Sequence, residues 1–203
     1  MKVALWCRNH LPVLIVPIVL VLDQASKFAV KLNMRIGEDI RIFDWFHIHF
    51  LENNGMAFGM SFGENAGKLI LSLIRLALIV FLCWYIRKVN TAYKAKEVKA
   101  SLVVCLSLIL AGAIGNMIDC AFYGLIFSDS YFSLATLFPE GGGYAPLLFG
   151  RVVDMLYFPL IRGKEVLFFR PVFNLADSAV TVGFFLFVLT QRSLWWPASR
   201  KSS

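Results

Sequence analysis

Charged side chains are scarce in this chain of 203 residues. Asp, Glu, Lys and Arg together make up 16% of it, whereas about 25% is usual in soluble domains. Hydrophobic residues make up 59%, against roughly 45–50% in soluble domains. A soluble globule of this size cannot hide so much apolar surface, so a bilayer is the expected solvent. We expect a single membrane domain over residues 1–203.

Acidic residues are fewer than basic ones, which gives the chain a net charge of +7. On one face of a soluble protein, this charge would suggest a nucleic-acid partner. Here the basic residues lie beside apolar runs, which is the pattern that orients membrane proteins. We therefore expect a basic membrane protein that binds no nucleic acid.

Paired cysteines are also missing. Cys7, Cys83, Cys105 and Cys120 are scattered and form no Cys-x-x-Cys motif. Three of them lie in or beside apolar segments, where a free cysteine behaves as a small hydrophobic residue. We expect neither a disulfide framework nor a zinc site.

Four long apolar runs are typical of membrane-spanning helices. Each has about the 20 residues needed to cross roughly 30 Å of hydrocarbon at 1.5 Å per residue. A spanning backbone must satisfy its own hydrogen bonds, which favours helices. No small-x-small cleavage site follows the first run, so we expect it to be a retained helix. The expected helices cover residues 11–30, 69–86, 102–123 and 173–189.

Basic residues gather at one end of these helices. Ten of the 20 basic residues, with one of the 13 acidic residues, lie before the first helix, between the second and third, or after the fourth. The positive-inside rule places that side, with both termini, in the cytoplasm. Trp195 and Trp196 would then anchor the chain at the inner membrane surface.

Two segments remain for the outer side, residues 31–66 and 124–170. The first contains the aromatic, partly alternating stretch 43–51, which suits short strands, and then the turn formers Asn53-Asn54-Gly55. The second is rich in Phe, Leu, Tyr and Gly. We expect an integral membrane, mainly α-helical protein with four transmembrane helices, a small extracytoplasmic β-sheet and a long, partly helical outer segment.

Several polar residues lie where hydrocarbon makes them costly. A charged side chain at the bilayer centre costs about 2.5–3.5 kcal/mol on insertion scales, and such residues usually mark function. Asp23 and Lys27 are four residues apart, so they share a helix face and can pair. We interpret them as a structural ion pair. The full set is Asp23, Lys27, Arg75, Asn116, Asp119, Asp154, Asn174 and Asp177.

Two Asn–Asp pairs repeat one spacing. Asn116 and Asp119 are three residues apart in the third helix, and Asn174 and Asp177 repeat this spacing in the fourth. Each pair points one way, which is inward if its charge is to avoid lipid. The orientation puts both pairs near the outer helix ends, where Asp154 can join them. Spacing alone leaves three hypotheses open: proteolysis, a cation or proton pathway, and hydrogen bonding between helices.

Arg75 and two histidines are harder to interpret. Arg75 lies within the second expected helix and must snorkel or meet an acid, for which Asp23 and Asp119 are candidates. His47 and His49 alternate on one strand face, a spacing compatible with metal binding. No cysteine or further histidine lies nearby in the sequence. We interpret them as polar residues of a half-exposed strand and expect no metal.

Five short motifs occur in order along most of the chain. They are Leu22-Asp23-Gln24-Ala25-Ser26-Lys27, Asn53-Asn54-Gly55-Met56-Ala57-Phe58, Gly115-Asn116-Met117-Ile118-Asp119, Val152-Val153-Asp154 and Phe173-Asn174-Leu175-Ala176-Asp177-Ser178. With four helices in the same orientation, this order resembles the lipoprotein signal peptidases, also called signal peptidase II.

The resemblance implies an enzyme of the bacterial cytoplasmic (inner) membrane, with its active site at the outer face. It would cleave the signal peptide of a prolipoprotein on the amino side of a cysteine that carries a diacylglyceryl group. Its catalytic residues would be Asp154 and Asp177. The implied partners are this substrate, membrane lipids and inhibitors of the globomycin type, and we expect a monomer. The residues expected to line or support the site are Asn53, Gly55, Asn116, Asp119, Asn174, Asp23 and Lys27.

Two features depart from the family pattern. Cys120 stands where the family usually has arginine. Two alternatives stay open: the basic partner is missing, or Arg75 or Arg151 substitutes for it. The stretch between Asp119 and Asp154 is longer than the family's short connection, and we expect it to form an extra flap over the site.

Peptide hydrolysis needs an activated water and a proton for the leaving amine. Two neighbouring carboxyl groups that share one proton can supply both, because like charges in contact do not both ionise easily. This chemistry requires neither a metal nor an organic cofactor. The competing hypothesis is a small multi-pass transporter that binds ions or protons through the same acids. Four helices are few for the usual inverted repeat, and the sequence contains no visible duplication.

Overall fold

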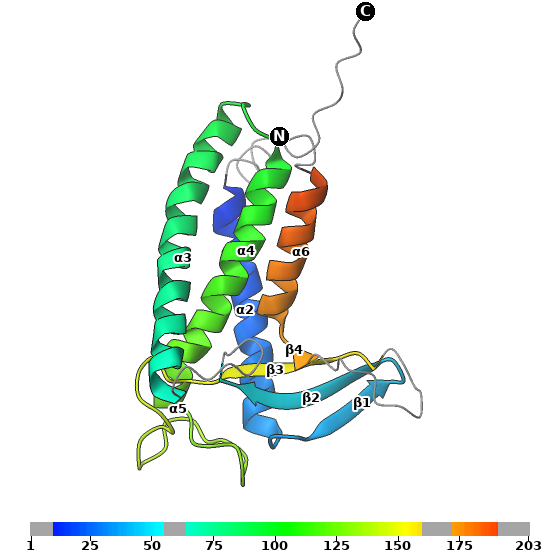
Figure 1. Cartoon of the computed structure of the whole chain (residues 1–203). Helices are drawn as coiled ribbons and strands as arrows, with labels where there is room; N and C mark the ends of the chain where they lie inside the picture. The colour runs from blue at the N-terminus through cyan, green and yellow to red at the C-terminus, as the bar shows by residue number, and fades with distance from the viewer. Residues whose placement is uncertain (1–9, 55–63, 160–171, 191–203) are drawn as a thin grey trace, which may run out of the picture.

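The computed structural model describes residues 10–54, 64–159 and 172–190. Long helices form an elongated bundle, and a small sheet crosses one end of it (Figure 1). The helices are α2 (Leu11–Asn33), α3 (Glu64–Lys94), α4 (Ala100–Ile118) and α6 (Leu175–Thr190). Helix α4 continues through a π-helical turn, η2 (Asp119–Tyr123), into the short helix α5 (Gly124–Ile126). We call the end of the bundle that carries the sheet the sheet end.

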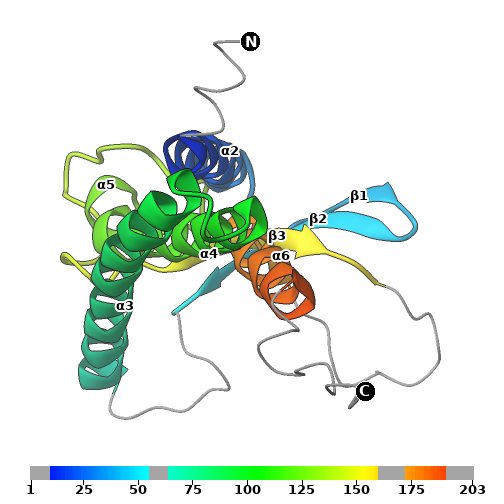
Figure 2. The ribbon, with the colours of Figure 1, turned by 90° about the horizontal axis from the view of Figure 1, so that it is seen from above.

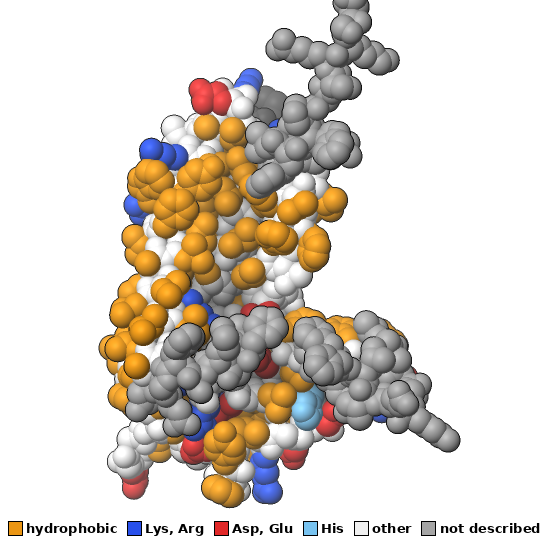
Figure 3. Space-filling model, viewed as in Figure 1, with side chains coloured by type: hydrophobic (Ala, Val, Ile, Leu, Met, Phe, Trp, Pro, Cys, Tyr) orange, Lys and Arg blue, Asp and Glu red, His pale blue; other side chains and the backbone are white. Residues whose placement is uncertain are grey.

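The helices are those of an integral membrane protein, as the sequence predicts. Among the residues that the structure describes, three segments are long and apolar enough to cross a membrane, namely Leu11–Asn33, Ala66–Lys94 and Ala100–Ile126. Helix α6 is also apolar and has 16 residues within the described range. Hydrophobic side chains cover the visible face of the bundle (Figure 3), and Val80 on α3 is 62% exposed. This apolar surface is suited to contact with lipid tails.

Several helix boundaries differ from the prediction. Helix α3 extends beyond the predicted range 69–86 at both ends, because polar residues that follow an apolar run can continue its helix into the interface. The fourth helix begins at Leu175, two residues later than predicted, because Val172–Phe173 forms strand β4.

The sheet has four antiparallel strands in the order β1-β2-β3-β4. They are β1 (Asp39–Phe43), β2 (Phe46–Asn53), β3 (Val152–Tyr157) and β4 (Val172–Phe173). The short strands predicted around residues 43–51 are confirmed. In its described residues, the partly helical segment expected at 124–170 contains the short helix α5 and the strand β3. The residues of β3 find their partners in β2, far away in sequence.

Helix α4 lies at the centre of the bundle and contacts α2, α3 and α6 (Figure 2). Its approach to α6 depends on a residue without a side chain. A Cβ atom on Gly112 would lie 2.2 Å from the carbonyl oxygen of Ala176 and 2.6 Å from Cγ2 of Val180. Close contact of the two backbones places the polar residues that follow on α4 beside the start of α6.

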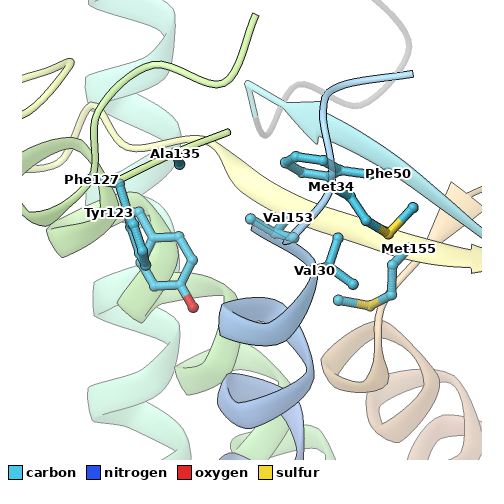
Figure 4. Close-up of a cluster of buried hydrophobic side chains, with 8 residues drawn as sticks. All are labelled: Val30, Met34, Phe50, Tyr123, Phe127, Ala135, Val153 and Met155. Atoms are coloured by element: carbon cyan, nitrogen blue, oxygen red, sulfur yellow. The ribbon is translucent and has the colours of Figure 1, made fainter. Parts of the chain in front are cut away.

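A buried apolar cluster lies at the sheet end, where the last turns of α2 meet strands β2 and β3 (Figure 4). We call it the rear cluster. Phe127 and Ala135 come from the long segment that precedes β3 and pack in this cluster with Val153 and Met155. Asp154 lies between those two residues, so its side chain points to the opposite face of the strand. The described part of the expected flap therefore packs behind the strand that carries Asp154. The cluster consists of Val30, Met34, Phe50, Tyr123, Phe127, Ala135, Val153 and Met155.

Candidate active site

Asn174 and Asp177 form a reciprocal cap at the start of α6. Asn174 precedes the helix as its N-cap, and its Oδ1 accepts a hydrogen bond of 2.9 Å from the backbone N–H of Asp177. In return, the Asp177 carboxylate accepts one of 3.4 Å from the backbone N–H of Asn174. This arrangement satisfies helix donors that would otherwise lack partners. The spacing of three residues thus marks a helix start, which the prediction that placed both residues within the helix did not recognise.

Asn174 also links the start of α6 to strand β3. Its Nδ2 group donates to Oδ1 of Asp154 at 2.8 Å, and it contacts the carbonyl oxygen of Val153 at 3.2 Å. One amide side chain therefore contacts both carboxyl-bearing elements, and Asp154 and Asp177 lie in one hydrogen-bonded unit.

Asn116 on α4 is oriented by its neighbours. Its Oδ1 accepts hydrogen bonds of 3.0 Å from Nζ of Lys27 and 3.0 Å from Nδ2 of Asn174. Its own Nδ2 donates to Oδ1 of Asp177 at 2.7 Å. Because a lysine ammonium can only donate, Lys27 fixes which end of the Asn116 amide faces Asp177.

A buried ionic layer supports these residues. Nζ of Lys27 lies 2.9 Å from Asp23 and 2.8 Å from Asp119, and all three side chains are fully buried. Gln24 donates to both carboxylates, at 3.1 Å for Asp23 and 3.0 Å for Asp119, and accepts a hydrogen bond of 3.1 Å from the Tyr123 hydroxyl. The predicted pairing of Asp23 with Lys27 is confirmed, with Asp119 as a second partner.

The two supporting acids each hold the backbone next to one of the predicted catalytic acids. Oδ2 of Asp119 accepts a hydrogen bond of 3.2 Å from the N–H of Val153, which precedes Asp154. Oδ1 of Asp23 accepts one of 2.9 Å from the N–H of Ala176, which precedes Asp177. The ionic layer therefore connects β3 and α6 to the membrane helices.

Asp154 is almost fully buried, with 5% of the residue exposed. Burial first, and then the nearby charge of Asp177, raises the pKa of Asp154 to about 7. Hydrogen bonds from Asn174 and Asn53, and the charge of Lys27, act in the opposite direction. A carboxyl group with this pKa can hold a proton near neutral pH, which is what acid–base chemistry by two carboxyl groups requires.

The structure brings together the described residues that the sequence singled out. Asn53, at the end of β2, reaches Asp154, whereas Gly55 lies outside the described residues. Gln24 and Tyr123 were not assigned to the site, although both belong to its hydrogen-bond network. Tyr123 lies four residues after Asp119, on the same side of its helical turn, and this spacing could have identified it.

Arg75 lies against the unusual residue at position 120. Its Nη1 atom is 3.3 Å from Sγ of Cys120, which fits the alternative in which Arg75 provides the basic group there. Lys27 pairs with the two acids that were candidate partners of Arg75. The other candidate, Arg151, binds Glu52 at 2.9 Å and Asp129 at 3.2 Å.

His47 and His49 face a carboxylate from the neighbouring strand. Nδ1 of His47 lies 2.7 Å from Oδ1 of Asp39, and Nδ1 of His49 lies 3.4 Å from Oδ2 of the same residue. Within the described ranges, no group of three or more His, Cys, Asp or Glu residues could hold a metal ion. Cys83, Cys105 and Cys120 are free thiols.

Comparisons with a family model and with known proteins point to the same family. A family model described as signal peptidase (SPase) II matches residues 15–192. A lipoprotein signal peptidase of Porphyromonas gingivalis is 44% identical over 186 residues, which cover 86% of this chain and 80% of that protein. A lipoprotein signal peptidase of Amoebophilus asiaticus is 36% identical over 190 residues, which cover 85% of this chain and 74% of that protein.

Two solved structures share the fold. Both are bacterial membrane enzymes studied by the in meso method, at 2.3 Å and 1.9 Å resolution. The first has a TM-score of 0.60 and 23% identity and covers 96% of this chain and 94% of its own. The second has a TM-score of 0.58 and 24% identity, with coverage of 90% and 92%. At this level of identity, the structural similarity supports the fold and carries no conclusion about function.

Proposed function

The chain belongs to the signal peptidase II family, and from this membership we propose that it is an intramembrane aspartyl endopeptidase with Asp154 and Asp177 as its catalytic residues. The family makes it a membrane peptidase that acts on prolipoprotein signal peptides. The proposed cut falls on the amino side of the cysteine that carries the diacylglyceryl group. The observation that carries the proposal is the hydrogen-bonded unit in which Asn174 contacts Asp154 and caps the helix turn of Asp177.

In the proposed reaction, the two carboxyl groups share one proton. The ionised carboxylate takes a proton from water, whose oxygen attacks the carbonyl carbon of the scissile bond. The protonated carboxyl group donates to the carbonyl oxygen. When the tetrahedral intermediate collapses, the C–N bond breaks and the amine leaves with a proton from the pair. One hydroxyl group of the intermediate returns its proton to the pair as the carbonyl re-forms, which restores the starting state. The raised pKa of Asp154 supports a pair that retains one proton near neutral pH. Because coupled groups titrate together, neither acid has a fixed role.

The supporting residues are proposed to fix the geometry of this pair. Asn116 and Asn174 orient the two acids through hydrogen bonds. Asp23, Lys27 and Asp119 hold the backbones beside them. Orientation of this kind lowers the barrier because the reacting groups need not be ordered during the reaction. We assign Asn53 and Gly55 to substrate binding or site support, and the proposed reaction needs no cofactor.

We place the sheet end at the outer face of the bacterial cytoplasmic (inner) membrane, with both termini in the cytoplasm. The last turns of α3 and its connection to α4 lie at the opposite end of the bundle (Figure 1). They carry Arg87, Lys88, Lys94, Lys96 and Lys99, which favours the cytoplasmic side. Water can then reach the two acids from outside, while the lipid chains of the substrate remain in the outer leaflet. We propose that one chain, surrounded by membrane lipids, forms the complete enzyme.

The direct test replaces each acid with its amide. Asp154→Asn and Asp177→Asn should each reduce cleavage of a diacylated prolipoprotein by at least about 10³-fold while the protein remains inserted, because each removes a proton-transferring group. Asp44→Asn serves as a control, since this exposed carboxylate pairs with neighbouring Arg41. Near-normal turnover by either active-site variant would refute the assignment.

A second test uses the inhibitor class that the family resemblance implies. A globomycin-type cyclic peptide should bind the purified protein and block cleavage. The alternative, a multi-pass ion or proton transporter, predicts ion flux in vesicles and no cleavage. Family membership does not favour this alternative.

A further inference from the structure

Strand β3 is supported on the face opposite to Asp154. Val153 and Met155 point into the rear cluster, where they are 0% and 1% exposed. Phe127 and Ala135 of the segment before β3 lie in the same cluster (Figure 4). The segment 127–151 therefore packs directly behind the strand that carries a proposed catalytic acid.

An ion cluster joins the same segment to β2 and α2. The side chain of Glu52 pairs with Lys31 of α2 and, through Oε2, with Nη1 of Arg151 at 2.9 Å. Lys31 also donates to the Ser130 hydroxyl at 2.8 Å. Arg151 reaches Asp129 at 3.2 Å. The cluster thus contains two basic residues that share one buried carboxylate, since Glu52 is 1% exposed at its side chain.

Aromatic rings complete the cluster. The Tyr144 ring lies 5.0 Å from Nζ of Lys31 and 4.7 Å from the guanidinium carbon of Arg151. The Tyr144 hydroxyl accepts a hydrogen bond of 2.7 Å from the backbone N–H of Arg151. The position of residue 151 is consequently fixed through both its side chain and its backbone.

This cluster lies at the start of the catalytic strand. Arg151 directly precedes β3, and Glu52 is the register partner of Val153. The pairing of β2 with β3 is irregular between Ile48 and Leu51, and in the described part of the chain β4 contributes two residues to the other edge. The strand ladder by itself therefore constrains Asp154 weakly, and the contacts behind it supply further constraint.

We propose that Glu52 and Arg151 are positioning residues for the reaction. They hold β3 so that the Asp154 carboxyl group keeps its position relative to Asp177. The proposal rests on the proposed function, because it assigns the two acids to catalysis. A buried ion cluster is weak support for stability but can specify one arrangement over others. The competing explanation is that the cluster only stabilises the long segment. It predicts a loss of folded protein with no change in kcat for each folded molecule.

The decisive variant is Glu52→Gln, which keeps the side-chain shape but leaves Lys31 and Arg151 without their shared negative charge. We expect kcat per folded enzyme to fall about 10²-fold, as for a misplacement of about 1 Å, with KM unchanged. Asp44→Asn is the matched control because it makes the same change from carboxylate to amide in an exposed ion pair, at the turn between β1 and β2. Folded enzyme is measured by gel filtration and thermal unfolding in detergent. A wild-type kcat in folded Glu52→Gln would overturn the proposal.

A second pair of variants applies if Glu52→Gln does not fold. Arg151→Lys keeps the positive charge and should retain most of kcat, whereas Arg151→Gln should show the large loss. Equal kcat values in these two variants and the wild type would overturn the proposal.

A measurement without substrate separates this proposal from the proposed function. The carboxyl carbon of Asp154 can be followed by NMR across a pH titration of labelled protein, with Asp154→Asn to identify its signal. Its midpoint should move in Glu52→Gln or Arg151→Gln, because the strand shifts relative to Asp177, and stay fixed in Asp44→Asn. A wild-type protein that does not cleave prolipoprotein would refute the proposed function, while the titration would still decide the positioning role. An unmoved midpoint in both Glu52→Gln and Arg151→Gln would refute that role.

Discussion

Asp154→Asn is expected to stabilise the folded protein above pH 7 although it removes catalysis. In the wild-type protein, burial and the charge of Asp177 raise the pKa of Asp154 from the ordinary 3.8 to about 7. The difference corresponds to about 4 kcal/mol of unfolding free energy, because each pKa unit is worth about 1.36 kcal/mol. An asparagine side chain carries no charge, so it is neither repelled by Asp177 nor penalised for losing the hydration of a charge. The variant should therefore avoid this cost.

The direction in which the stability difference between the variant and the wild type changes with pH follows from the raised pKa of Asp154. A carboxyl group whose folded-state pKa is raised binds its proton more tightly when folded, so its protonation favours folding at low pH. As pH rises from about 4 to about 7, this stabilisation is lost, and above about 7 the loss is complete. The stability of Asp154→Asn relative to the wild type should therefore increase across this window and then remain constant.

The measurement is chemical unfolding of purified protein in detergent, followed by tryptophan fluorescence at a series of pH values. Asp44→Asn is the control, because the carboxylate that it removes is 63% exposed at the side chain. A constant stability difference between pH 4 and 8, or an Asp154→Asn protein less stable than the wild type at pH 8, would refute the reasoning.

Three further predictions concern activity and packing. The kcat for prolipoprotein cleavage should decline above about pH 7, because Asp154 then loses the proton that it shares with Asp177; a pH–rate profile that stays flat to pH 9 would contradict this. Asp23→Ala should lower folded yield by removing one partner of a buried ion pair, at a cost of about 3–5 kcal/mol, and normal yield without activity would instead give Asp23 a chemical role. Gly112→Leu should prevent the close approach of α4 to the Ala176 carbonyl and reduce thermal stability by more than the 1–3 kcal/mol typical of overpacking, whereas an unchanged melting temperature would contradict the packing described.

The helices and the supporting ion pair could be predicted from local sequence. An apolar run long enough to span a bilayer has few alternatives to a helix, and Asp23 and Lys27 lie one helical turn apart. The gathering of Asp119, Asp154 and Asp177 at one end followed from the orientation of the helices. These features depend on spacing along one element, which the sequence contains directly.

The missed features depend on contacts between distant segments or on uncharged residues. Strand β3 pairs with β2, but helices α3 and α4 lie between the two strands in the sequence. No local pattern could therefore identify the register of this pairing. Gln24 was overlooked because an uncharged amide in an apolar helix gives a weaker signal than a charged residue. Asn174 was placed inside the helix because its spacing from Asp177 fits a helix face as well as an N-cap.

The pairing of Asp23 with Lys27 within α2 also bears on how the protein is made. Helix α2 is synthesised before α4 and α6, which later surround this pair. Since both charges lie on one helix, α2 carries its own counterion during membrane insertion and does not wait for a partner from another helix. Asp177 arrives only with the last described helix, so the proposed catalytic pair is completed after the other described helices have been made. A nascent chain can therefore acquire its polar interior in stages and remain inactive until α6 has docked.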